Sequence, residues 1–195
     1  MKAMIYYAEL KRLMDATKDF TSKNDNKPIH TYVRLEFHKD DLSVRASALD
    51  GYMLSTEWGS CGDFNKEFTE DFTVLLKPWM FARIGKCEYL VFSRSGNEVT
   101  IATSDGVKFS YQMPSPDDFL NVDAAIPKDE ATYRIGFNGK MLMTMLKAAS
   151  VYSPINRPVV LELRRPLSPA ILRTTSERGH ENVKMVMPMR LKDGV

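Results

Sequence analysis

The stretch NVKMVMPMRL, residues 182–191, alternates with a period of two, which is the pattern of a half-buried β-strand. One of its two faces carries Val183, Met185, Met187, Met189 and Leu191. We expect this face to belong to a core, as in the last strand of a β-rich domain. Pro188 has no amide hydrogen to give to a sheet ladder, so the strand should lie at a sheet edge or be interrupted there. Flexible methionine side chains at such an edge would also suit a groove for an apolar peptide.

The rest of the chain repeats one order of elements, a strand, a helix and three strands, three times at intervals of about sixty residues. The first repeat has a strand over 1–7, an amphipathic helix over 8–22, and strands over 32–38, 43–49 and 52–58. The second has a strand over 72–76, a helix over 79–86, and strands over 89–93, 98–103 and 107–113. The third has a strand through Ile135 and Phe137, a helix capped by Asn138, and strands over 159–163, 170–174 and 182–191.

One helix and four strands leave an apolar face that a neighbour must cover. We therefore expect an α+β fold in which the helices pack on one side of curved antiparallel sheets. A proline-containing, acidic segment interrupts the repeats between Pro114 and Glu130. This places a domain of two repeats at 1–116, a linker at 117–130 and a half domain at 131–195.

Composition excludes several classes of protein. The chain has 195 residues, 44% hydrophobic and 27% charged, which is ordinary for a soluble globular protein. The formal net charge of +2 is nearly neutral, so any affinity for nucleic acid has to come from a local patch. Cys61 and Cys87 are too few for a disulfide framework, and a reduced, cytoplasmic setting fits best. Neither a signal peptide nor a membrane-spanning run is recognisable.

No catalytic constellation is recognisable either. His30, His38 and His180 are scattered, without metal-ligand spacing or a nearby nucleophile signature. A glycine loop with lysine that could hold phosphates is lacking as well. The acidic pairs at 40–41 and 117–118 fall in a predicted turn and in the linker, where carboxylates commonly serve solubility. We expect a protein that is not an enzyme and that has no metal site and no cofactor.

Three groups of segments resemble the bacterial DNA sliding clamp family, the beta subunit of DNA polymerase III. IGFNGKMLMTMLKAAS (135–150), PVVLELRRPLSPAIL (158–172) and VMPMRL (186–191) are similar to the last half-domain of that family. ASALDGYML (46–54) is similar to a segment of its middle domain, and FLNVDAAIP (119–127) to the segment that joins the middle and last domains. Leu49 and Met53 stand where the family has threonine and arginine.

The resemblance implies a DNA clamp-like fold with three of the family's six repeats. The first two repeats resemble the middle domain, and the third resembles the second half of the last domain. In the family, the cleft between the middle and last domains receives a short apolar peptide from polymerases, the clamp loader and repair proteins. The matching positions here are Tyr32, Leu49, Gly51, Tyr52, Leu54, Leu120, Ala124, Ala125, Asn138, Met141, Leu167, Pro169, Met185, Val186, Met187, Pro188, Met189, Arg190 and Leu191.

The family's helices line a sleeve for duplex DNA, which would be gripped at its phosphates without regard to sequence. The candidate contacts on the predicted helices are Lys11, Arg12, Lys18, Lys77, Arg83, Lys86, Lys140 and Lys147. Acidic residues share the first helix, and a mixed-charge face is usually only solvated. Two hypotheses result. One is a replication processivity factor that self-associates around DNA and tethers a polymerase. The other is a clamp-derived adaptor or decoy that binds clamp-motif peptides and does not encircle DNA.

Overall fold

The computed structural model describes residues 1–24, 27–132, 134–150, 159–165, 167–175 and 180–191. The chain divides into two compact units, unit 1 over Met1–Pro127 and unit 2 over Lys128–Val195, and each is described by itself. Unit 1 thus extends into the segment 117–130 that the sequence suggested as a linker. Among the helices that the structure describes, none is both long and apolar enough to cross a membrane.

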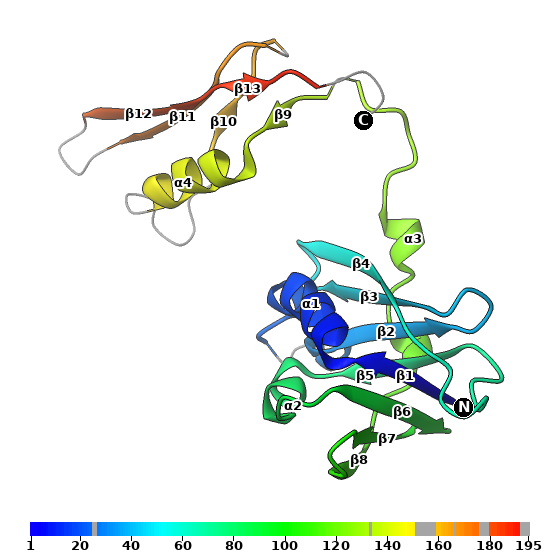
Figure 1. Cartoon of the computed structure of the whole chain (residues 1–195). Helices are drawn as coiled ribbons and strands as arrows, with labels where there is room; N and C mark the ends of the chain where they lie inside the picture. Colours follow the sequence, from blue (N-terminus) through cyan, green and yellow to red (C-terminus); the bar gives the residue numbers. More distant parts are fainter. Residues whose placement is uncertain (25–26, 133, 151–158, 166, 176–179, 192–195) are drawn as a thin grey trace. The chain divides into compact units, whose positions relative to one another are not determined.

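Unit 1 contains the first two repeats in the predicted order (Figure 1). The first repeat comprises β1 (Lys2–Tyr6), α1 (Tyr7–Thr17), β2 (Val33–His38), β3 (Ser43–Leu49) and β4 (Leu54–Ser60). The second comprises β5 (Phe72–Leu76), α2 (Pro78–Arg83), β6 (Tyr89–Ser95), β7 (Glu98–Thr103) and β8 (Lys108–Gln112). Short helices η1 (Lys18–Phe20), η2 (Pro28–Thr31), η3 (Pro116–Asp118) and α3 (Val122–Ala125) complete it. The prediction of a helix and antiparallel strands in each repeat is confirmed.

The two repeats of unit 1 exchange their first strands. The sheets have the orders β1-β6-β7-β8 and β4-β3-β2-β5, so that β1 joins the sheet of the second repeat and β5 joins that of the first. The exchanged strands place apolar pairs inward, with Ile5 opposite Leu90 and Val74 opposite Leu35, and all four side chains are fully buried. Neither repeat therefore has a complete sheet without the other.

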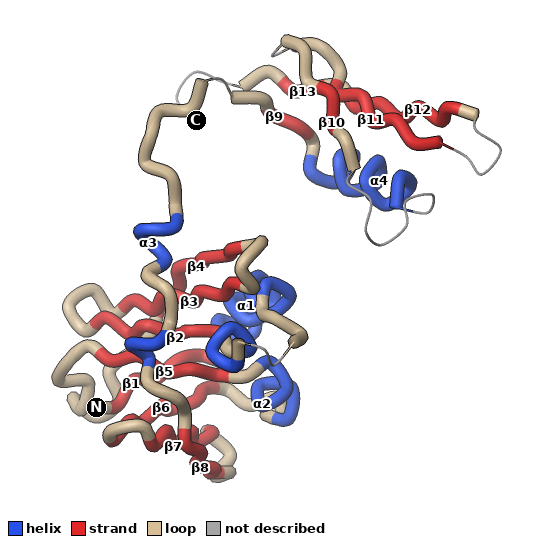
Figure 2. Tube along the Cα trace, turned by 180° about the vertical axis from the view of Figure 1, so that it is seen from behind, coloured by secondary structure: helices blue, strands red, loops and turns tan. Residues whose placement is uncertain are grey.

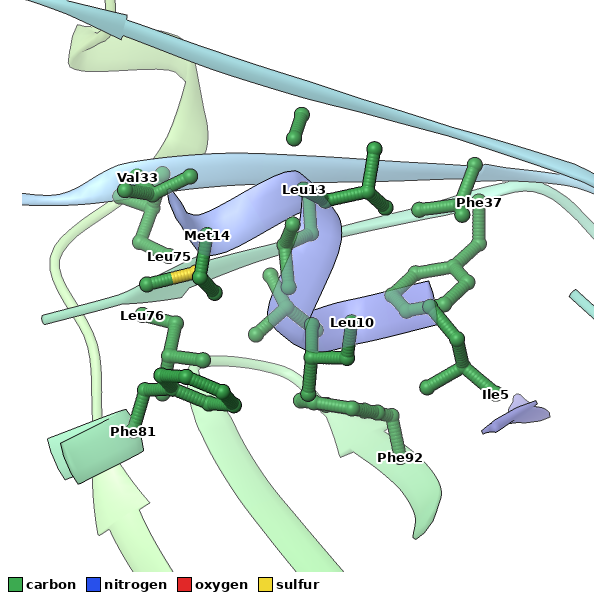
Figure 3. Packing of buried hydrophobic residues seen from close by; sticks show 14 of the residues in the cluster. Ile5, Leu10, Leu13, Met14, Val33, Phe37, Leu75, Leu76, Phe81 and Phe92 are labelled. Carbon is green, nitrogen blue, oxygen red and sulfur yellow. The ribbon is translucent and has the colours of Figure 1, made fainter. Parts of the chain in front are cut away.

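A single core fills the space between the exchanged sheets and the helices. Helix α1 buries Leu10, Leu13 and Met14 completely. Figure 3 shows that these side chains meet Leu75, Leu76, Phe81 and Phe92, which come from the second repeat. Phe37 stacks on Phe72 with ring centroids 4.8 Å apart and lies 5.4 Å from Phe92, so one aromatic cluster joins both sheets. Figures 1 and 2 place α1 and α2 beside each other on one side of the unit.

Unit 2 contains the third repeat. Its elements are β9 (Gly136–Phe137), α4 (Gly139–Ser150), β10 (Leu161–Glu162), β11 (Ala170–Thr175), β12 (Glu181–Val186) and β13 (Pro188–Met189). The strands β10, β11 and β12 form a three-stranded sheet, and β13 pairs with β9. The strand predicted over 182–191 is interrupted between Val186 and Pro188, as the proline indicated.

The face of this last strand that belongs to the core was predicted wrongly. Val186 is buried with Ala170 and Leu172, whereas Met185 and Met187 are 60% and 58% exposed. Val186 lies opposite Ala170 in the ladder, and this side of the sheet packs on α4. Because Val186 gives the other face an apolar residue too, the period of two alone could not indicate which face a helix would cover. The methionine face is therefore exposed in unit 2.

Candidate functional site

A hollow of about 220 Å³ lies in unit 1 between the β3–β4 turn and the segment that leads into α3. It is lined by Leu49, Gly51, Tyr52, Met53, Leu54, Leu120 and Ala125. All of these except Met53 are among the residues predicted to bind a peptide, so the structure brings two separate parts of the sequence together. The sequence analysis named Met53 only as a departure from the family pattern and did not predict it as a lining residue. Its position within the 46–54 motif, between the predicted residues Tyr52 and Leu54, could have indicated that it lines the hollow.

The first wall of the hollow is a tight turn held by one carboxylate. Asp50 accepts hydrogen bonds from the backbone amides of Tyr52 and Met53, each at 2.8 Å. Gly51 has φ +97°, a left-handed conformation that glycine adopts without steric cost. The turn leaves Leu49 buried at the base of the hollow and Tyr52 98% exposed at its rim. The two amide hydrogen bonds lower the pKa of the Asp50 carboxyl below its ordinary value of 3.8.

We expect Asp50→Ala to destabilise unit 1 by about 1 kcal/mol, because two turn amides lose their acceptor in a solvated setting. The native pKa is lowered, so this contribution is present above the unfolded-state pKa and is lost as the pH falls through the lower native value. Urea denaturation of both proteins at pH 7 and pH 3 measures the difference, which should shrink at pH 3. An equal difference at both pH values would contradict a role for the ionised carboxylate.

The second wall of the hollow is anchored to unit 1 on both sides of Leu120. Phe119 and Val122 are 5% and 2% exposed, whereas Leu120 between them is 50% exposed and faces the hollow. Asn121 caps α3 by accepting from the amides of Asp123 and Ala124. The anchored neighbours explain why an irregular segment can hold an apolar side chain in a fixed place.

An ion pair adds to this anchor. The guanidinium of Arg45 on β3 donates to both carboxylate oxygens of Asp123, at 2.9 and 2.7 Å. These hydrogen bonds raise the pKa of Arg45 above its ordinary value. Arg45 also lies over the ring of Trp58, 5.5 Å from its centroid. Bidentate pairing of this kind fixes orientation as well as distance, so α3 is held in register with the strand that forms the first wall.

Two predicted peptide-binding residues of unit 1 lie outside the lining of the hollow. Tyr32 packs partly against the core, and the ammonium of Lys77 lies 4.9 Å from its ring centroid. Ala124 is exposed on α3, next to the lining residue Ala125.

The remaining predicted peptide-binding residues belong to unit 2. Asn138 caps α4 by accepting from the amides of Lys140 and Met141, both at 3.1 Å. Val186 is buried in the core of the unit, and Pro169 and Pro188 are half-buried. The exposed members are Met141, Leu167, Met185, Met187, Met189, Arg190 and Leu191. A cleft that these residues would share with the β3–β4 turn stays a prediction.

The predicted DNA contacts on α1 and at the start of η1 are engaged in ion pairs. Lys11 and Lys18 both bind the carboxylate of Asp15, and these contacts lower the pKa of Asp15. Arg12 binds Glu9 at 2.9 Å and donates to the backbone carbonyl of Trp58 at 2.6 Å. All three cations thus take part in ion pairs, and the two lysines share one carboxylate.

The other candidate DNA contacts are of two kinds. Lys77 and Arg83 lie over aromatic rings, those of Tyr32 and Trp79. Lys86, Lys140 and Lys147 are exposed, and within the described part of the chain none of them takes part in an ion pair. The two lysines of α4 are therefore the helical cations most available to a phosphate.

Comparison with known proteins finds the fold and not a sequence family. No protein-family model matches the chain, and no curated protein matches it. The DNA polymerase sliding clamp of Bacillus subtilis superposes with a TM-score of 0.78 at 16% identity, over 96% of this chain and 49% of the clamp. The DNA polymerase III subunit beta of Pseudomonas aeruginosa superposes with a TM-score of 0.78 at 15% identity, over 96% of this chain and 51% of that subunit. The DNA polymerase III beta subunit of Thermotoga maritima superposes with a TM-score of 0.76 at 17% identity, over 96% of this chain and 50% of that subunit.

The chain spans about half of the length of the clamps that it matches. The resemblance predicted from the motifs at 46–54, 119–127 and 186–191 is confirmed at the level of the fold. With nearly all of its residues aligned, this chain has the fold of the bacterial DNA sliding clamps, the beta subunits of DNA polymerase III, over about half of their length.

Proposed function

We propose that this chain is a sliding-clamp-like processivity factor of DNA replication, which tethers a DNA polymerase to duplex DNA and does so without enzymatic activity. The observation that carries the proposal is the hollow of unit 1, which is lined almost entirely by apolar side chains and lies in a clamp fold. A short apolar peptide from a polymerase or another clamp-binding protein fits this chemistry. The proposal includes a DNA polymerase and duplex DNA as binding partners and the cytoplasm as the location.

The energy for peptide binding would come from burying exposed apolar surface. Tyr52, Met53 and Leu120 are 98%, 48% and 50% exposed, so a peptide has apolar area to remove from water. Fully burying one large apolar side chain is worth roughly 1.5–3 kcal/mol. Two or three such contacts are enough for weak, reversible binding, because ordering a short peptide costs part of the gain. Weak binding suits a protein that exchanges partners.

A titration tests the peptide site directly. A fluorescently labelled peptide with the clamp-binding motif of a bacterial DNA polymerase is titrated with the full chain, and anisotropy is measured. We expect saturable binding with a Kd below about 100 μM, and no binding of a peptide whose apolar residues are replaced by serine. If anisotropy does not saturate up to about 500 μM protein, the hollow is not a peptide site.

A second candidate function is favoured by the ion pairs of α1. An adaptor that binds clamp-motif peptides without encircling DNA needs no free cations, and Lys11, Arg12 and Lys18 are all engaged in ion pairs with Asp15 or Glu9. The peptide site is common to both functions. Binding of duplex DNA therefore separates them.

The processivity factor should bind duplex DNA of any sequence, with an affinity that falls as salt rises. Replacing both lysines of α4, Lys140→Gln and Lys147→Gln, should lower the slope of log K against log salt by about 1.8, because each phosphate contact contributes about 0.9. Lys108→Gln on β8 is the control, since it removes one exposed cation from a strand rather than a helix. Anisotropy of two unrelated labelled duplexes measures both quantities. Undetectable DNA binding at low salt would favour the adaptor.

A further inference from the structure

Many of the methionines of this chain are exposed. Seven of the twelve are 39–62% exposed, although methionine ranks among the residues that proteins most often bury. The exposed ones are Met1, Met53, Met141, Met143, Met185, Met187 and Met189. Peroxide converts an accessible methionine into methionine sulfoxide, which turns a flexible apolar side chain into a polar one. The consequence at each position depends on what the side chain contacts.

The other five methionines are covered by protein. Met14, Met113 and Met145 are 0%, 4% and 6% exposed, and Met4 and Met80 are half-buried. The sulfur of Met113 also accepts a hydrogen bond from the backbone amide of Leu75 at 3.3 Å, which engages a lone pair that an oxidant would need. The chain therefore contains its own reference for the effect of exposure, because buried and exposed thioethers meet the same oxidant.

The two cysteines compete poorly for peroxide. The thiolate is the reactive form of cysteine. Burial raises the pKa of Cys61 to about 12, and it also raises the pKa of Cys87. Both side chains are therefore protonated thiols at neutral pH. A thioether has no proton to lose, so its reactivity depends on exposure instead. We expect oxidation of this chain to occur first at the exposed methionines.

Met53 is the methionine that lines the hollow of unit 1. It is 48% exposed, so an oxidant can reach it when no peptide is bound. Its backbone is fixed, because the amide of Met53 donates to the Asp50 carboxylate and β4 begins at the next residue, Leu54. The side chain is thus held at the hollow while part of its surface stays accessible. The sliding clamp family has arginine here, which has no sulfur to oxidise.

We propose that Met53 is an oxidation site through which hydrogen peroxide lowers the affinity of the hollow for its peptide. The thioether sulfur gives a lone pair to one peroxide oxygen, so that an S–O bond forms and the O–O bond breaks. The proton on the transferred oxygen passes to the departing hydroxide, which leaves as water. Sulfur is oxidised and peroxide is reduced. A methionine sulfoxide reductase reverses the change with electrons from a dithiol, which becomes a disulfide as water forms.

A sulfoxide at this position would be poorly accommodated once a peptide covers it. Its oxygen only accepts hydrogen bonds, and the backbone amides of Tyr52 and Met53 already donate to Asp50. Apart from the Tyr52 hydroxyl, the side chains that share the hollow are apolar, namely Leu49, Leu54, Leu120 and Ala125. A bound peptide would therefore take water from the sulfoxide and leave it with few donors. In the free chain the group stays solvated, so the fold should not change.

Peptide titration before and after oxidation tests the proposal, which rests on the proposed function because it concerns the same hollow. The full chain is treated with hydrogen peroxide until mass spectrometry of its proteolytic fragments shows that Met53 is converted, and catalase then removes the peroxide. We expect the Kd for the labelled clamp-motif peptide to rise about tenfold. Methionine sulfoxide reductases and a dithiol should restore the original Kd. The same mass spectra should show that Met14 and Met113 are converted last.

Two leucine variants locate the effect. Met53→Leu keeps an apolar side chain of similar volume and removes the sulfur. Its Kd after peroxide, relative to its own Kd before treatment, should rise by less than about twofold. Met143→Leu is the matched control, because Met143 is 55% exposed on α4 and is not among the predicted peptide-binding residues. This variant should lose affinity on oxidation by the same factor as the original chain.

The proposal fails if Met53 is fully converted and the Kd does not change. It also fails if Met53→Leu loses as much affinity on oxidation as the original chain, because the loss would then arise at other methionines, such as those at 185–189. These outcomes leave the peptide site itself intact. An untreated chain that does not bind the peptide overturns the proposed function, and this proposal with it, so the two kinds of failure are distinguished before any peroxide is added.

Discussion

Replacing Phe37 with alanine is expected to lower the free energy of unfolding of unit 1 by about 3–5 kcal/mol. Phe37 is fully buried on β2, and its ring stacks on Phe72 and lies against Phe92. These partners come from the second repeat, so the substitution leaves a cavity between the two sheets. Trp58 and Trp79, the two tryptophans of the chain, both lie in unit 1. Their fluorescence during urea unfolding of the full chain therefore reports this unit.

Phe64→Ala is the matched control for Phe37→Ala. Phe64 is half-buried, and its nearest aromatic contact is Tyr89 at 6.5 Å, so its truncation should cost only about 1 kcal/mol. Because each sheet of unit 1 contains a strand from the other repeat, both tryptophans should report one shared transition. Two separate transitions, or equal effects of the two substitutions, would contradict a core that is shared by both repeats.

The elements of this fold could be predicted from the sequence because each depends on local chemistry. Three strands begin and end at the predicted residues, Ser43–Leu49, Phe72–Leu76 and Glu98–Thr103. Asp50-Gly51 indicated the turn that forms one wall of the hollow. This turn depends only on neighbouring residues, because Gly51 adopts the left-handed conformation and the Asp50 carboxylate binds the amides of Tyr52 and Met53. The family resemblance then indicated Leu120 as a lining residue on the opposite wall, which spacing alone could not do.

What the sequence did not indicate depends on contacts between distant segments. The period of two shows that β1 and β5 are strands but does not show which strand each one joins, and the exchange between repeats was missed. The methionine face was assigned to the core because the position of α4 was unknown. The acidic residues of the first helix were noted, but only the structure shows that Asp15 binds both Lys11 and Lys18 and that Arg12 reaches Trp58 on β4.

Leu120→Glu is expected to raise the Kd for the clamp-motif peptide about 100-fold, which corresponds to about 2.7 kcal/mol. Leu120 lines the hollow from the α3 side, and a peptide that fills the hollow would cover it. A carboxylate there would lose its water without gaining a partner, because the other lining residues are Leu49, Gly51, Tyr52, Met53, Leu54 and Ala125. The fold should tolerate the change, since Leu120 is 50% exposed and its neighbours provide the anchor. The anisotropy titration measures the effect.

Ile126→Glu separates a local effect from a general effect of charge on peptide binding. Ile126 follows α3 directly and is 39% exposed, but it does not line the hollow. The same substitution six residues further along the chain should therefore change the Kd by less than about threefold. If both variants bind the peptide equally well, the peptide does not occupy this hollow. If both lose binding equally, the added charge acts at a distance or disturbs α3, and the denaturation midpoints of the two variants distinguish these causes. Only a large loss confined to Leu120→Glu agrees with a peptide whose apolar side chain is buried between the β3–β4 turn and α3.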